Sequence, residues 1–136
     1  MKKILIYSFI FVLSIFNINE AFSQTDQFKE VYTRAHIVCE YLDKDEWIDS
    51  KTIVVFNYND GSDIMMYKND GTSELFTVVG GFKEGYTDSG EKYQYTKALG
   101  EDGNEVYFQY FNSNGNLRIF IFGSNEDQTL KVEYLK

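Results

Sequence analysis

The chain has 136 residues, with 13 lysines and arginines against 21 aspartates and glutamates, and a formal net charge of −8. Binding to nucleic acid depends largely on clustered basic side chains, so this acidic balance excludes nucleic acid as an expected partner. The length predicts one domain, and the single cysteine, Cys39, cannot form a disulfide within the chain.

The first 23 residues have the pattern of a secretory signal peptide. Two lysines precede an uncharged apolar run at 4–16, and Ala21-Phe22-Ser23 provides small residues at the −3 and −1 positions of a cleavage site. As a helix this run would span roughly 20 Å, which is short of the ~30 Å hydrocarbon core of a bilayer. No cysteine adjoins the cleavage site. We therefore expect a secreted or periplasmic protein without a lipid anchor or membrane span, and a single β domain over residues 24–136.

The residues after the leader predict an all-β fold. They contain no proline and are rich in Tyr, Phe, Val and Ile, and Asn-Asp-Gly and related turn sequences separate the apolar runs. Strands joined by such short turns must run antiparallel. The expected architecture is an antiparallel meander of about seven or eight strands that forms a small barrel, a half-barrel or a sandwich. The predicted strands lie at about 34–41, 51–58, 63–68, 73–79, 92–99, 105–111, 117–122 and 129–135.

The segment 28–42 fits both a helical stripe and one face of a strand. The β-branched pair Ile37-Val38 favours a strand, preceded by a short N-terminal helix. On a strand, His36 and Cys39 point to opposite faces, and two such ligands are too few for a structural zinc site. We predict no catalytic residue, metal or cofactor; Cys39 is either free or joins two chains.

Four carboxylates, at positions 43, 45, 46 and 49, surround the only tryptophan, Trp47. An aromatic ring flanked by carboxylates could bind a sugar, and two carboxylates at a suitable separation could hydrolyse one. The alternative is an acidic loop between strands, with Trp47 capping the core.

Residues 80–91 form the longest predicted irregular stretch, which is either a recognition or gating segment containing Tyr86 or a plain connection. The sequence Ser89-Gly90-Glu91-Lys92-Tyr93 is similar to the Ser-Gly-x-Lys/Arg-Tyr motif of the periplasmic C-type lysozyme inhibitors. These are small β-barrel proteins that insert this loop into the cleft of a basic enzyme. The resemblance covers five residues, and a single cysteine cannot make the disulfide usual in that family. It implies Ser89 and Lys92 as contacting residues.

The predicted strands at 105–111 and 117–122 are apolar on both faces. Tyr107, Phe111, Phe120 and Phe122 lie opposite Val106, Phe108, Ile119 and Ile121. One face must pack the core, and the other is covered by a further element, lines a ligand cavity or meets a partner.

The leading hypothesis is a non-enzymatic binding module for a small apolar ligand or a protein partner. The binding residues would come from the aromatic set Tyr107, Phe111, Phe120 and Phe122 and from Tyr86, Ser89 and Lys92. One alternative is a periplasmic inhibitor or immunity-type protein that acts on a basic enzyme. Another is a carbohydrate-binding or carbohydrate-active protein.

Cleavage of the leader predicts the mass of the exported protein. Intact-mass measurement of protein from the culture medium or periplasm should give a chain that begins at Gln24. An exported form that still carries Met1 would contradict the signal-peptide interpretation.

Overall fold

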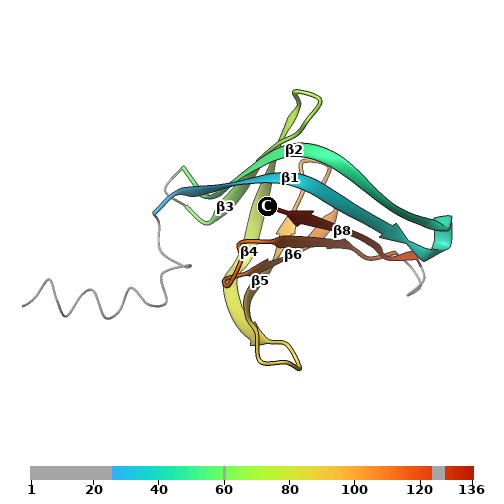
Figure 1. Cartoon of the computed structure of the whole chain (residues 1–136). Helices are drawn as coiled ribbons and strands as arrows, with labels where there is room; N and C mark the ends of the chain where they lie inside the picture. Colours follow the sequence, from blue (N-terminus) through green and yellow to red (C-terminus); the bar gives the residue numbers. More distant parts are fainter. Residues whose placement is uncertain (1–25, 60, 124–127) are drawn as a thin grey trace, which may run out of the picture.

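The fold is an eight-stranded antiparallel barrel (Figure 1). A computed structural model describes residues 26–59, 61–123 and 128–136, so the predicted leader lies outside the described residues. Each strand pairs with the next, and β8 pairs with β1, which confirms the all-β meander and selects the closed barrel. The strands are β1 (Phe28–Cys39), β2 (Lys44–Tyr58), β3 (Asp63–Tyr67), β4 (Ser73–Tyr86), β5 (Lys92–Leu99), β6 (Glu105–Phe111), β7 (Leu117–Ile121) and β8 (Leu130–Leu135), and a 3-10 turn at Glu40–Leu42 connects β1 to β2.

Side chains alternate between the inside and the outside of the barrel because successive residues of a strand point to opposite faces. On β6, Val106, Phe108 and Tyr110 are buried in the interior, whereas Tyr107 and Gln109 face outward. The core forms where the inward-facing apolar residues of all eight strands meet: Tyr32, Val54, Phe56, Ile64, Met66, Phe76, Ala98, Val106, Phe108, Tyr110, Leu117 and Ile119, with Tyr134 packed against them.

One end of the barrel is filled by side chains, and we call it the closed end. The Phe56 ring lies 5.0 Å from that of Phe28 and 5.1 Å from that of Tyr110. Glu30 accepts a hydrogen bond from the Tyr110 hydroxyl, and its other carboxylate oxygen lies 2.6 Å from Lys136 Nζ. Apolar rings and a paired charge therefore leave little space at this end.

The opposite end is the open end, where the wall of the barrel is incomplete. Strand β3 is short and pairs only with residues 53–58 of β2, so residues 44–52 of β2 pair with β1 alone among the described strands. The β1–β2 hairpin extends beyond the other strands as a result, to the right in Figure 1. Lys44, Asp45, Glu46 and Asp49 lie along this edge, and such charges discourage pairing with another chain.

Three strands are longer than the sequence predicted. Strand β1 starts at Phe28, so the predicted short helix is wrong for 28–33, and β2 starts at Lys44, where an acidic loop was one alternative. Strand β4 continues to Tyr86, so the irregular stretch shrinks to residues 87–91. Gly80 and Gly81 have φ angles of 83° and 78° and lie within an irregularity between Val79 and Lys83, after which pairing with β5 resumes.

The described residues contain no helix long and apolar enough to cross a bilayer.

Replacing a large side chain by alanine should destabilise the fold more on the inside of the barrel wall than on the outside. Phe108 is 1% exposed and packs edge-on against Phe76 at 5.1 Å, so Phe108→Ala should lower the free energy of unfolding by about 3–5 kcal/mol. Phe122 is 57% exposed on the outside, and Phe122→Ala should cost less than about 1 kcal/mol. Urea unfolding followed by circular dichroism measures both; equal costs would contradict the assignment of inside and outside.

Candidate functional site

A cavity of about 230 Å³ lies inside the open end of the barrel. Its wall is apolar and comes from β3, β4 and β6–β8, with the ring of Tyr134 as the one inward-facing polar side chain of β8. Four polar side chains, from β4 and from the turns after β3 and β5, stand at its rim: Lys68, Glu74, Asp102 and Asn104. The apolar lining residues are Met66, Phe76, Val106, Ile119, Ile121 and Val132.

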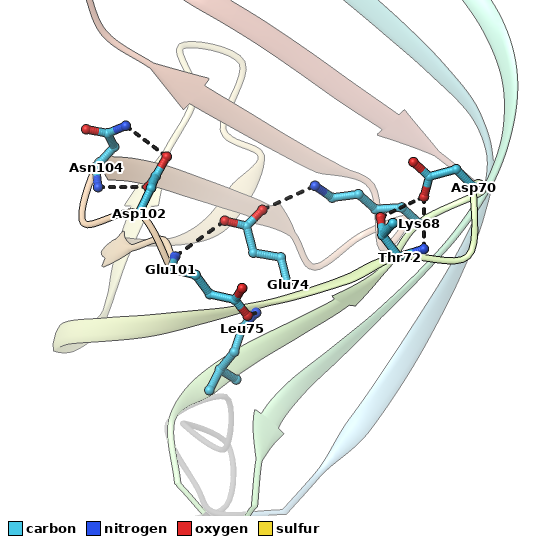
Figure 2. A network of polar contacts seen from close by, with 8 residues as sticks. All are labelled: Lys68, Asp70, Thr72, Glu74, Leu75, Glu101, Asp102 and Asn104. Atoms are coloured by element: carbon cyan, nitrogen blue, oxygen red, sulfur yellow. Dashed lines mark hydrogen bonds and ion pairs between the residues drawn. The ribbon is translucent and has the colours of Figure 1, made fainter.

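The rim is held together by hydrogen bonds between two turns (Figure 2). The Glu74 carboxylate accepts from Lys68 Nζ at 3.2 Å and from the backbone N–H of Glu101 at 3.4 Å. In return, the Glu101 carboxylate accepts from the backbone N–H of Leu75 at 2.9 Å. These contacts join the β3–β4 turn to the β5–β6 turn and so fix the width of this side of the mouth.

Asp70 and Asp102 each stabilise their own turn. Asp70 accepts hydrogen bonds from the hydroxyl and the backbone N–H of Thr72, and these bonds lower the pKa of its carboxyl group. Asp102 accepts from the backbone N–H and the side-chain amide of Asn104, and these bonds lower its pKa in the same way. Both residues are therefore carboxylates at neutral pH, and the rim is acidic.

Tyr134 brings a hydrogen-bonding group into the apolar interior. Its ring lies 5.8 Å from that of Tyr32, and burial raises the pKa of its phenol. The Tyr32 hydroxyl donates to the carbonyl of Gly115 at 2.7 Å, whereas no group of the described residues hydrogen-bonds the Tyr134 hydroxyl. A bound molecule with an acceptor atom could therefore be oriented by this donor.

Three of the four predicted aromatic site residues lie together on the outside of the barrel, not in the cavity. The ring of Phe122 is 5.1 Å from that of Tyr107 and 6.1 Å from that of Phe120. Phe111 is not exposed with them, because the guanidinium of Arg118 lies 4.8 Å over its ring and covers it, although its ring lies 5.7 Å from that of Tyr93 on the same outer surface. Two further rings of this outer surface, Tyr93 and Tyr95, were missed, although the alternation along 92–99 was a sufficient signal.

The remaining predicted site residues lie on the β4–β5 hairpin, the yellow hairpin at the bottom of Figure 1. Tyr86 is 64% exposed, and the Ser89 hydroxyl lies 2.9 Å from that of Thr87 within the turn. The Lys92 ammonium is 3.2 Å from the Glu84 carboxylate, so contact with a partner through Lys92 would compete with this ion pair. None of these three residues lines the interior cavity.

Trp47 does not cap the core. It is half exposed on the outside of the β1–β2 hairpin, stacked against His36 at 4.1 Å with Arg34 on the ring at 4.7 Å. His36 Nε2 lies 2.7 Å from Asp45 Oδ1, while Cys39 is buried on the opposite face, as strand geometry predicted. The carboxylates at 43, 45, 46 and 49 are all exposed, and none lines the interior cavity or lies with the rings of Tyr107, Phe120 and Phe122.

The described residues contain no cluster of three or more His, Cys, Asp or Glu side chains that could hold a metal ion. Comparison of the chain with known protein families, with curated proteins and with solved structures finds no match.

Three buried phenols predict a loss of stability at alkaline pH. Burial raises the pKa values of Tyr32, Tyr110 and Tyr134 in the folded state, with a further increase for Tyr110 from its hydrogen bond to Glu30. The unfolded chain ionises these groups first, at about pH 10, so the stability is fully present below that pH and is lost as the pH rises above it.

The melting temperature should therefore fall as the pH rises from about 8 to 11. The melting temperature of Tyr134→Phe should fall less steeply than that of the wild type, because the variant lacks one of the three phenols. Tyr86→Phe, at an exposed position, is the control, and its melting temperature should show the same pH dependence as that of the wild type. If the melting temperature of Tyr134→Phe fell in parallel with that of the wild type, the Tyr134 phenol would not contribute to the loss of stability at alkaline pH.

Proposed function

We propose that this chain is a non-enzymatic binding protein that holds a small, largely apolar molecule in the open end of its barrel. The cavity at that end carries the proposal: it is concave, mostly apolar and supplied with a few polar groups at defined places, the usual properties of a small-molecule site. The mouths of β-barrels are among the places where such sites occur.

The size of the cavity limits the ligand. Its volume of about 230 Å³ is below the range of about 300–1,000 Å³ for sites of drug-sized ligands. A dry apolar cavity of about 150 Å³ accepts benzene. The proposed ligand is therefore a single ring with a short substituent, or an aliphatic molecule of similar volume.

The polar groups limit its chemistry further. The unpartnered Tyr134 hydroxyl favours a ligand with an oxygen or nitrogen acceptor at its buried end. At the rim, Glu74 and Asp102 outnumber Lys68, whose ammonium is already paired with Glu74. Long-chain carboxylates and other anions are therefore disfavoured, and a neutral ligand fits best.

The proposal includes export of the protein from the cytoplasm. A leader at residues 1–23 would deliver the mature domain to the periplasm or the exterior, where a carrier of small molecules could capture its ligand. The excess of acidic residues would keep such a carrier soluble and away from anionic lipid.

Titration with toluene, acetophenone and indole, followed by amide chemical shifts, tests the proposal. At least one of these neutral ring compounds should bind saturably and shift the amides of Ile119, Val132 and Tyr134 in the cavity wall. Acetophenone, which has a carbonyl acceptor, should bind more weakly to Tyr134→Phe than to the wild type.

A matched pair of variants on neighbouring residues separates the cavity from the outer surface. Ile121 faces inward at the mouth, so Ile121→Trp should fill the entrance and weaken binding at least about tenfold. Phe122 faces outward, so Phe122→Trp should leave affinity unchanged. No binding by any of the three compounds, or equal effects of the two variants, would contradict the proposal.

A further inference from the structure

A second recess lies on the outside of the barrel, across β4–β7, and is separate from the proposed ligand cavity. It is a groove of about 300 Å³, and we call it the aromatic groove. Five outward-facing aromatic residues are among those that line it: Tyr93 and Tyr95 from β5, Tyr107 from β6, and Phe120 and Phe122 from β7 and the residue that follows it.

Four of the rings form two pairs, and an amide from β6 lies beside the first pair. Tyr93 and Tyr95 lie 5.9 Å apart on β5, while Phe120 and Phe122 lie 6.1 Å apart with ring planes only 5° from parallel. Gln109 is the direct β6 partner of Tyr95 and also lines the groove. The surface therefore combines flat ring faces with an amide and phenol hydroxyls that can donate and accept hydrogen bonds.

A glycine allows one of these rings to lie against the strand beneath it. Gly85 is the β4 partner of Tyr93, and a Cβ atom at Gly85 would lie 2.6 Å from two carbon atoms of the Tyr93 ring. The φ angle of Gly85 is not in the left-handed region, so the backbone itself would accept alanine. The methyl group of an alanine would instead collide with the Tyr93 ring and displace it. The position of Tyr93 in the groove thus depends on a glycine at this point.

The groove carries no unpaired charge of its own. Its one carboxylate, Glu84, is 3.2 Å from the ammonium of Lys92. Anions would be repelled by a chain of net charge −8, and the groove offers a cation ring faces but, among its lining residues, no free carboxylate to pair with it. A neutral occupant with both an apolar face and hydroxyl groups therefore best matches the rings, the amide and the phenol hydroxyls of the groove.

We propose that the aromatic groove binds a neutral oligosaccharide. A hexose ring presents a face of C–H groups that packs on the electron-rich face of an aromatic ring, and its peripheral hydroxyls exchange hydrogen bonds with groups such as the Gln109 amide and the tyrosine phenols. The two ring pairs would hold neighbouring sugar units of an extended chain. This activity is additional to small-molecule binding in the barrel and uses different residues.

Calorimetric titration of the mature protein with cellohexaose, maltohexaose, xylohexaose and chitohexaose tests the inference. One or more of these neutral oligosaccharides should bind, and Tyr107→Ala and Phe122→Ala should each weaken that binding about tenfold or more. Phe122 is mostly exposed, so its truncation keeps the test valid if Tyr107→Ala fails to fold. Gly85→Ala, which displaces the Tyr93 ring without removing any groove side chain, should also weaken binding.

Trp47→Ala is the matched control, because Trp47 is an exposed aromatic residue on a distant part of the barrel wall, on β2. It should leave oligosaccharide affinity unchanged, and Phe122→Ala should leave acetophenone binding in the barrel unchanged. Absence of binding by all four oligosaccharides, or an equal loss in Trp47→Ala, would overturn the inference. A concentration-dependent dimer abolished by Phe122→Ala would also overturn it, because a second copy of the chain would then occupy the groove.

Discussion

The pairing of β8 with β1 is the contact on which the rest of the structure depends. Residues Arg34–Val38 of β1 pair with Lys131–Leu135 of β8, and this ladder converts an open meander into a closed barrel. An open sheet of this composition would expose two strand edges and one apolar face. Closure removes both edges along this ladder and gives every strand an inside and an outside, so burial of the core no longer requires a second sheet.

Closure also explains how so small a chain can carry two recesses. Neighbouring residues of the same strands supply both surfaces: Ile119 and Ile121 line the interior cavity, while Phe120 and Phe122 line the aromatic groove. The closed end is filled by rings and by the Glu30–Lys136 ion pair, so the interior space lies at the end where β3 is short. The position of the cavity thus follows from unequal strand lengths and not from any sequence motif.

Alternation was enough to predict that Tyr107, Phe120 and Phe122 share a face, because inside and outside repeat every two residues. It could not predict that Phe111 is covered, since its cover, Arg118, comes from the neighbouring strand and depends on register. The predicted irregular stretch began at Gly80-Gly81, whereas in the structure these glycines lie at an irregularity within β4, after which pairing with β5 resumes. Closure depends on strand tilt and stagger around the whole barrel, which no local pattern specifies, so the sequence left barrel, half-barrel and sandwich open.

Nuclear Overhauser effects between β1 and β8 test the central claim most directly, because these strands are separated by almost the whole chain in sequence. In a closed barrel, contacts should connect Ala35 with Tyr134 and Ile37 with Val132, the pairs that the register places opposite each other. Their presence would establish the inner and outer surfaces on which both proposed sites rest. A complete set of contacts between successive strands, without any between β1 and β8, would indicate an open sheet and contradict the account.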